Sequence, residues 1–347
     1  MLPSNALPSN AAVLSETRVP QQHEAVLITA AGGPEALRLG TLPVPVPGPE
    51  EVLIKVSAAG VNRHDCNQRR AGPEYDPNPV PGLEVAGEIV ALGSGVPRSR
   101  LGERVAALTE GGGYAHYVAA ASTLALPWPR SLSRVEAAAL PEALFTAWFN
   151  FFDVLRLRPG ERVLIHGGTS GVASLAIQAL TAGGYEVFAT CGSERKRAAA
   201  LGFGAKAAFD YNDAGLAAQV KAATDGHGVD VILDVSAGAH LAADLEMLAR
   251  DGRIGHLSAG GGKELSIPLR TRMAKRISIT GSLLRPLDLK RKAAVAERLL
   301  RDVWPLIGAR VRPAVAATFP LAEAADAHRA MEKSDHIGKI VLTVDPT

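Results

Sequence analysis

Several residue types are scarce in this chain of 347 residues, and each scarcity excludes a class of protein. The two cysteines, Cys66 and Cys191, are too few for a disulfide framework or a four-cysteine zinc lobe. Aromatic residues make up 5%, and 37 Lys and Arg against 35 Asp and Glu leave a net charge of +2. So small a charge gives no reason to expect nucleic acid or an anionic membrane as a partner. No apolar run reaches the ~18 residues of a membrane span.

The first 22 residues have no apolar period and are rich in Pro, Ser and Asn, with LPSNA at 2–6 and again at 7–11. Their opening residues carry no Lys or Arg, unlike a secretory signal. We therefore expect 1–22 to be a flexible arm. A chain without such a signal and with two cysteines is expected in the reducing cytoplasm.

What is present has ordinary globular proportions, with 47% hydrophobic and 21% charged residues, and the length predicts two domains. Between 24 and 146, short apolar runs are broken by Gly and Pro, which indicates a compact sheet or barrel. The proline-rich stretches 43–49 and 77–81 cannot lie in central strands. Strands are predicted at 26–28, 52–56, 85–92, 103–108 and 115–118.

From about 160 to 284, strand patterns alternate with helix patterns. Such alternation predicts an α/β fold with a parallel sheet covered by helices on both faces, and the nearly all-apolar strands agree. Strands are predicted at 162–166, 185–190, 206–209, 229–234, 252–257 and 277–281, and helices at 172–182, 194–201, 213–224 and 240–250.

A glycine-rich turn, HGGTSGVA at 166–173, follows the first strand of this series and precedes a helix. This is the context of a dinucleotide fingerprint, in which the backbone and the helix N-terminus approach a pyrophosphate. When the turn is aligned with the pattern G-x-G-x-x-G, the three glycine positions are occupied by Gly168, Ser170 and Ala173, so the middle glycine is missing. A Walker loop is excluded because no Gly-Lys-Ser/Thr follows. The alternative is a structural turn that binds no ligand. The alternation of strands and helices around the turn favours a dinucleotide-binding site.

The end of the second strand indicates which dinucleotide is bound. An NAD site usually has an acidic residue there for the ribose hydroxyl, but the chain reads TCGS at 190–193, followed by Arg195, Lys196 and Arg197. A hydroxyl and cations favour a 2′-phosphate, so we predict NADPH. Glu194 could instead bind a ribose hydroxyl, so NADH remains an alternative cofactor. For the three cations, the alternative is that they lie on a solvated helix face and bind no ligand.

A series of motifs extends the argument to the whole chain. In order they are PGPEEVLIKV (47–56), AGVN (59–62), PGLEVAG (81–87), GYA (113–115), AAALP (137–141), TAW (146–148), the turn at 166–173 and HIGKIVL (336–342). With them the chain resembles, over about 24–344, the zinc-free quinone oxidoreductase branch of the medium-chain dehydrogenase/reductase superfamily, to which zeta-crystallin belongs.

The resemblance implies a GroES-like β-rich catalytic domain at 23–146, completed by 286–347, and a Rossmann doubly wound NADPH-binding domain at 147–285. It implies that Asn62, Tyr75 and Thr146 face the nicotinamide as catalytic residues. Around Tyr75 the chain reads GPEYDP, where the family usually has Gly-Leu-Tyr-Pro. The cofactor-binding residues implied besides Asn62 and Thr146 are Gly168, Thr169, Ser170, Gly171 and Val172 at the pyrophosphate, Gly192, Ser193, Lys196 and Tyr211 around the 2′-phosphate, and Ser282, Leu283, Leu284 and Lys339 along the rest.

No metal site is expected. Where zinc dehydrogenases of the superfamily have His-Glu, the chain has Leu83-Glu84, and the first ligand cysteine falls near Asn62. The triplet at 64–66, His-Asp-Cys, is expected in a strand or loop, where neighbouring side chains diverge too far for a tetrahedral site. Without zinc to polarise an alcohol, reduction of an already activated acceptor is favoured.

These observations predict an NADPH-dependent quinone oxidoreductase in which Asn62 and Tyr75 donate hydrogen bonds to the acceptor oxygen. For Asn62 the alternative is a turn residue, and for Tyr75 a half-buried loop aromatic. An NADPH-dependent enone or enal reductase and a low-turnover NADPH-binding structural or RNA-associated protein remain alternative functions. The apolar stretch 276–284 is a plausible sheet edge, and the resemblance implies a homodimer joined there.

Overall fold

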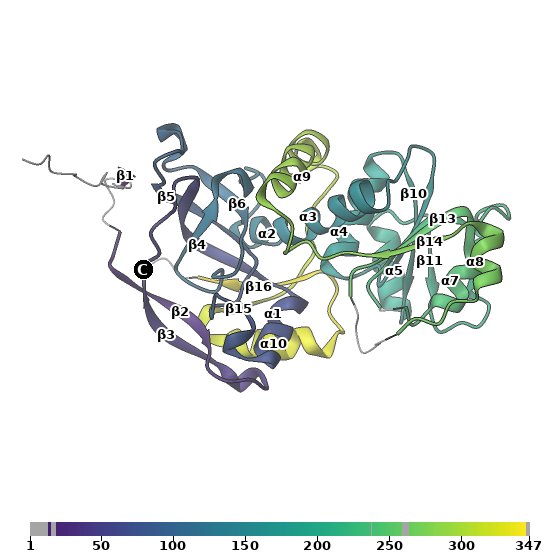
Figure 1. Cartoon of the computed structure of the whole chain (residues 1–347), viewed down its shortest axis with the longest axis horizontal. Helices are drawn as coiled ribbons and strands as arrows, with labels where there is room; N and C mark the ends of the chain where they lie inside the picture. The colour runs from purple at the N-terminus through teal and green to yellow at the C-terminus, as the bar shows by residue number, and fades with distance from the viewer. Residues whose placement is uncertain (1–12, 15–18, 237, 259–263, 345–347) are drawn as a thin grey trace, which may run out of the picture. The chain divides into compact units, whose positions relative to one another are not determined.

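The computed structural model describes residues 13–14, 19–236, 238–258 and 264–344, which divide into two compact units (Figure 1). The first unit holds the described residues through Trp128, Phe319–Glu332 and those from Val341 on. The second holds Pro129–Thr318 and Lys333–Ile340. Most of the expected arm, residues 1–12 and 15–18, lies outside the described residues.

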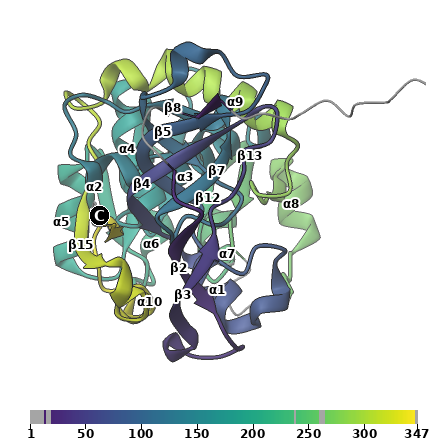
Figure 2. The same cartoon turned by 90° about the vertical axis from the view of Figure 1, so that its left-hand side faces the viewer.

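The first unit is built on an antiparallel sheet. The strands run in the order β15-β16-β4-β5-β6-β8, with β7 paired to β4 and β1 paired to β5. The strands β2 and β3 form a separate antiparallel ribbon (Figure 2). The strands are β1 (Val13–Leu14), β2 (Gln22–Ile28), β3 (Leu37–Pro43), β4 (Glu51–Val61), β5 (Glu84–Leu92), β6 (Arg104–Leu108), β7 (Tyr117–Ala121), β8 (Ala125–Pro127), β15 (Val315–Pro320) and β16 (Lys339–Thr343).

Two helices belong to this unit, α1 (Arg63–Ala71) and α10 (Ala324–Lys333). The expectation that residues 64–66 lie in a strand or loop is therefore wrong, since they form the first turns of α1. The backbone N–H of Asn62 donates to Asp65 Oδ2 over 2.8 Å, so the Asp at the third helical position closes back on the residue before the helix. This local exchange starts a helix in a stretch with little hydrophobic period.

The second unit is a doubly wound α/β structure with the parallel strand order β11-β10-β9-β12-β13-β14, which confirms the predicted fold class. Its strands are β9 (Arg162–His166), β10 (Glu186–Cys191), β11 (Ala207–Asp210), β12 (Val229–Asp234), β13 (Leu248–His256) and β14 (Ser278–Gly281). Its helices are α2 (Arg134–Ala138), α3 (Pro141–Trp148), the π-helical η5 (Phe149–Val154), α4 (Gly171–Ala182), α5 (Glu194–Gly202), α6 (Leu216–Ala223), α7 (Leu241–Met247), α8 (Leu269–Lys275) and α9 (Leu289–Asp302).

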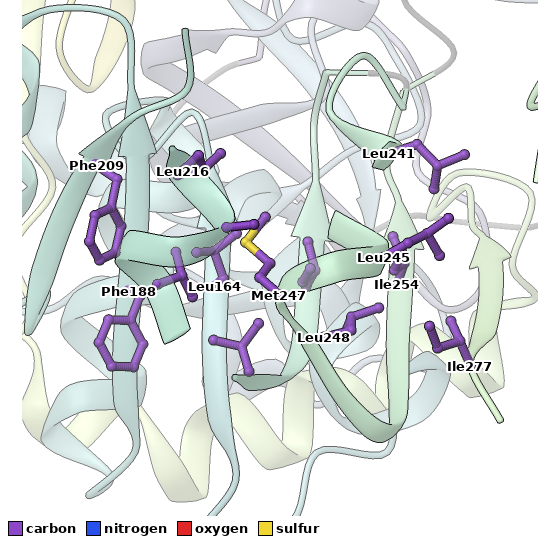
Figure 3. Packing of buried hydrophobic residues seen from close by; sticks show 14 residues of the cluster. Leu164, Phe188, Phe209, Leu216, Leu241, Leu245, Met247, Leu248, Ile254 and Ile277 are labelled. Carbon is purple, nitrogen blue, oxygen red and sulfur yellow. The ribbon is translucent and has the colours of Figure 1, made fainter. Parts of the chain in front are cut away.

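A buried cluster holds one face of this sheet against its helices (Figure 3). Leu164 and Phe188 reach it from β9 and β10, and Leu216 and Leu245 from α6 and α7. The helix predicted at 240–250 ends early, at Met247, because Leu248 already pairs with Val229 as the first residue of β13. Here strand pairing overrides the helical pattern.

The unit boundaries do not coincide with the domain boundaries suggested by the sequence. Residues 129–146 belong to the second unit, where α3 packs against α4 and α9. Every residue of α3 except Glu142 is buried, which explains why it stays with these helices. None of the helices in the described ranges combines the length and the apolar character that a bilayer crossing requires.

Candidate functional site

The strands β9 and β12 are neighbours in the sheet of the second unit. The chain continues from β9 to β10 on one side of this pair and from β12 to β13 on the other, so the strand order reverses between them. In open parallel sheets, ligands bind beyond the strand ends at this reversal of order. The turn after β9 leads directly into α4, whose first N–H groups have no acceptor within the helix. An anion is favoured at such a helix start.

The glycine-rich turn is shaped by close packing. Gly167 has a φ of +65°, and a Cβ on Gly168 would lie 2.7 Å from the Cβ of Ala189 on β10. Ser170, at the position where the fingerprint has its middle glycine, has a φ of −65° and accepts a hydrogen bond from Ala173 N–H over 3.2 Å. Serine is therefore compatible with this turn, and it also caps the helix.

The segment before β16 lies against this turn. Gly338 N–H donates to Thr169 O over 2.7 Å, and Lys339 is 3% exposed. A Cβ on Gly171 would lie 2.3 Å from Cδ of Lys339, so the lysine stem occupies that space. Gly168, Thr169, Ser170, Gly171, Val172 and Lys339, all predicted to bind the cofactor, are thus brought together.

The residues predicted to bind the 2′-phosphate lie at and after the end of β10. A Cβ on Gly192 would lie 2.1 Å from the Tyr211 hydroxyl oxygen. The Ser193 hydroxyl accepts from Lys196 N–H over 3.3 Å and caps α5. Lys196 Nζ donates to the carbonyl of Ser334 over 2.7 Å, which neutralises none of its charge. The Tyr211 phenol thus lies beside Gly192, the Ser193 hydroxyl lies at the start of α5, and the Lys196 ammonium group binds a neutral carbonyl.

The other charged residues nearby are less suited to a phosphate. Arg197 forms an ion pair with Asp210 at 2.8 Å, and Arg195 with Asp335 at 2.9 Å. Glu194, which left NADH open, is exposed at the start of α5. Lys196 binds a neutral carbonyl group, whereas Arg195 and Arg197 bind carboxylates.

The rings of two histidines pack next to Tyr211 at the end of β10. His166 is hydrogen-bonded to Thr190 Oγ1 at 2.7 Å and to Asp244 Oδ1 at 2.8 Å. The His240 ring packs at a tilt against the rings of His166 and Tyr211, with ring centroids 4.9 and 5.1 Å apart. Burial and the neighbouring His166 lower the pKa of His240. His166 is a packed histidine, and His240 supports Tyr211, which the sequence did not indicate.

Thr146 and Ser282 are linked through Asn150, which the sequence did not single out. Asn150 Nδ2 donates to Thr146 O over 2.8 Å, and the Ser282 hydroxyl donates to Asn150 Oδ1 over 2.6 Å. Asn150 lies in the π-helical segment η5, a conformation frequent at functional sites. Leu283 is 70% exposed and Leu284 half-buried, with no polar side chain to offer a ligand.

Asn62 and Tyr75 belong to the first unit. Asn62 is 8% exposed, and its Nδ2 donates to Glu84 Oε1 over 3.0 Å, so its amide has a fixed orientation. Tyr75 is 55% exposed and lies beside His64, with ring centroids 6.2 Å apart. Glu84 is a positioning residue that the sequence offered only as half of an incomplete zinc motif.

The donors around α1 are a poor match for zinc. Asn62 is an amide bonded to Glu84, and Cys66 is buried, with a pKa that burial and the Asp65 carboxylate raise to about 12. Across the described ranges, no three His, Cys, Asp or Glu side chains are grouped to hold a metal ion. Burial raises the pKa of Cys191 and outweighs the lowering by the nearby Lys196 and Arg197.

Known proteins match this chain over nearly its full length. Residues 48–130 match the model of the alcohol dehydrogenase GroES-like domain, and 171–299 that of the zinc-binding dehydrogenase family. A quinone oxidoreductase of Rattus norvegicus is 34% identical over 330 residues, 92% of this chain and 97% of the rat protein.

Solved structures are also similar to this chain over nearly its full length. A structure described as an NAD-dependent alcohol dehydrogenase has a TM-score of 0.82 at 31% identity, covering 93% of this chain and 100% of that one. Mycobacterial Rv1454c complexed with NADPH has a TM-score of 0.81 at 28% identity, covering 92% and 99%.

Proposed function

Since the chain belongs to the medium-chain dehydrogenase/reductase superfamily, we propose that it is an NADPH-dependent quinone oxidoreductase that works without zinc. The superfamily makes it an oxidoreductase with a nicotinamide cofactor. The similarity to a rat quinone oxidoreductase over 97% of that protein supports a quinone as the acceptor.

The cluster of Ser193, Lys196 and Tyr211 at the end of β10 is the observation on which NADPH rests. A 2′-phosphate there would meet two hydroxyl groups and an ammonium group, while the nearest acidic side chain on β11, Asp210, is held by Arg197. An NAD site would instead need a carboxylate free for the ribose hydroxyls. The turn from Gly168 to Val172 would hold the pyrophosphate at the start of α4.

When bound, NADPH supplies the hydride, and a quinone that accepts it gathers negative charge on oxygen. We assign Asn62 and Tyr75 as hydrogen-bond donors to that oxygen. Glu84 holds the Asn62 amide by its Nδ2, which fixes the group before the acceptor arrives. The Thr146 hydroxyl donates to Glu142 over 3.0 Å, so its oxygen can still accept a hydrogen bond from the nicotinamide carboxamide.

The donors present support the zinc-free assignment. Asn62 and Glu84 bond to each other, and Cys66 is buried. We expect metal analysis of the purified protein to find less than a tenth of a zinc ion per chain (an order-of-magnitude bound) and a chelator to leave turnover unchanged. Stoichiometric zinc whose removal abolishes turnover would contradict the assignment.

The homodimer and the cytoplasmic location are also proposals. β14 is the last strand of the parallel sheet, and Ser278 at its start is exposed. An unpaired edge can join the same edge of a second copy about a twofold axis.

The test is a fluorescence titration with NADPH and NADH, followed by quinones with loss of nicotinamide absorbance as the readout. Preferential NADPH binding with quinone-dependent oxidation is expected. Turnover with an enone and none with quinones would make the protein an alkene reductase. NADPH binding with no turnover would leave a structural or RNA-associated role. Absence of NADPH binding would overturn the cofactor site.

A further inference from the structure

Two buried titratable residues at the carboxyl edge of the parallel sheet have no role in the site described so far. Asp234 ends β12 and His256 ends β13, and they are register partners in the pairing of these strands. His256 Nδ1 lies 3.0 Å from Asp234 Oδ2. The Asp234 side chain is fully buried, and that of His256 is 12% exposed.

Asp234 is held as a carboxylate. Its oxygens accept from the Ser236 N–H over 2.5 Å, from the Ser236 hydroxyl, and from the Gly238 N–H over 2.6 Å. Burial alone would raise the pKa of Asp234, but the contacts with His256 and Ser236 outweigh it and hold the pKa well below its usual range. A carboxylate facing Nδ1 makes that nitrogen the donor of the ring, which leaves Nε2 to face a ligand group.

Among the described residues, neither ring nitrogen of His256 has a partner with full hydrogen-bond geometry, although Nδ1 lies 3.0 Å from the Asp234 carboxylate. Among the residues that the structure describes, none is hydrogen-bonded to the buried Nε2 of His256. Buried polar atoms in folded proteins are nearly always satisfied, and an exception needs an explanation. A ring nitrogen oriented by a carboxylate and left without a partner at the ligand-binding edge of a sheet is explained by a ligand group that completes it.

The strand order indicates which part of a ligand this is. The 2′-phosphate cluster lies at the ends of β10 and β11, on one side of β9, whereas β12, β13 and β14 lie on the other. A dinucleotide crosses the reversal point between these halves. His256 also adjoins the predicted cofactor residue Ser282, whose N–H donates to His256 O over 3.2 Å. The dyad therefore lies on the side opposite the adenosine end.

We propose that Asp234 and His256 form a hydrogen-bonding dyad for the nicotinamide riboside half of the cofactor, with Nε2 accepting from a ribose hydroxyl. This inference rests on the proposed NADPH site. Asp234 acts through His256 and is a positioning residue, while His256 makes the contact.

The test compares two ligands that share the adenosine end. NADPH contains the nicotinamide riboside, and adenosine 2′,5′-bisphosphate lacks it. We expect His256→Phe to raise the Kd for NADPH about tenfold or more and to leave that for adenosine 2′,5′-bisphosphate within about twofold. The control is His227→Phe, which removes the imidazole of another His–Asp pair, His227 Nε2 to Asp230 Oδ1 at 2.9 Å, before the amino end of β12. It should change neither.

A second measurement needs no variant. In the ¹⁵N-histidine spectrum of the wild-type chain, the His256 Nε2 signal is identified by its loss in His256→Gln. This signal should shift when NADPH is added and should not shift with adenosine 2′,5′-bisphosphate. Equal loss of both ligands in His256→Phe, or no shift with NADPH, would overturn the dyad as a ligand site. Failure of the wild-type chain to bind NADPH would instead overturn the proposed function itself.

Discussion

At the residue scale, three glycines in the candidate site are determined by what lies beside them. Side-chain atoms of Ala189, Lys339 and Tyr211 occupy the space that a Cβ would take at Gly168, Gly171 and Gly192. A larger residue at any of these positions displaces a neighbour that belongs to the same site. The glycines therefore connect packing directly to ligand binding.

Gly192 gives a sharp prediction because any Cβ there meets the Tyr211 hydroxyl. Gly192→Ala should push Tyr211 out of the cluster and raise the Kd for NADPH about tenfold, measured by fluorescence titration. The matched control is Gly202→Ala at the other end of α5, where a Cβ meets no atom within 4 Å. It should bind NADPH normally. Equal affinity of both variants would remove Tyr211 from the site.

Lys196 should govern the choice between the two dinucleotides. Lys196→Met keeps the aliphatic stem and removes the charge, so the Kd for NADPH should rise about tenfold or more while that for NADH stays nearly unchanged. Arg197→Met is the comparison, because Arg197 already forms an ion pair with Asp210. Were Arg197→Met the more damaging of the two, the assignment of the 2′-phosphate to Lys196 would be wrong.

At the scale of single elements, α1 and α10 are joined by a buried hydrogen-bonded chain. Arg69 donates to Nδ1 of His328 at 3.3 Å, His328 Nε2 lies 3.2 Å from the Tyr114 hydroxyl, and that hydroxyl donates to Asp65 at 3.0 Å. The chain requires a neutral imidazole. Burial, together with Arg69 and Arg70, lowers the pKa of His328 to about 3.

Acid should therefore destabilise this region. His328 binds a proton in the unfolded chain below about pH 6.5 but in the folded chain only near its lowered pKa of about 3. Between these values the free energy of unfolding should decrease as the pH is lowered, by at most about 1.4 kcal/mol per pH unit. In urea unfolding at several pH values, His328→Gln should flatten this slope and the exposed-site control His227→Gln should not. An unchanged slope in His328→Gln would contradict the account.

The sequence predicted the elements with strong local patterns and missed those set by distant contacts. The strands from β9 to β14 and helices α4 and α5 follow alternation and an N-cap serine, so they could be predicted. Helix α1 has a weak period and depends on Asn62 and Asp65, and the end of α7 depends on pairing with Val229. Such contacts are not visible in a local pattern.

The same limit applies to the candidate site. The turn at 168–172 and the Ser193–Lys196 pair have fixed spacing and were predicted. Asn150, Glu84 and His256 were missed because each acquires its role from a partner far away in the sequence: Ser282, Asn62 and Asp234. No short motif marks these pairs.

At the scale of the whole molecule, the proposed dimer can be tested at the edge of the parallel sheet. Ser278 is exposed on β14, and both native cysteines are buried. Ser278→Cys should be joined to its own copy by a thiol-specific cross-linker that spans about 15 Å, because antiparallel pairing about an axis within this short strand keeps equivalent residues within about that distance. Ser99→Cys, exposed in the first unit, should not. Equal cross-linking of both, or of neither, would contradict a dimer at this edge.

The central claim is that the protein moves reducing equivalents from NADPH to a quinone. The most direct measurement is kcat/KM for a 1,4-quinone with NADPH and with NADH, in buffer containing a chelator. The account predicts quinone-dependent oxidation that is about tenfold or more faster with NADPH. Turnover that is equal with both dinucleotides, or that requires added zinc, would contradict it.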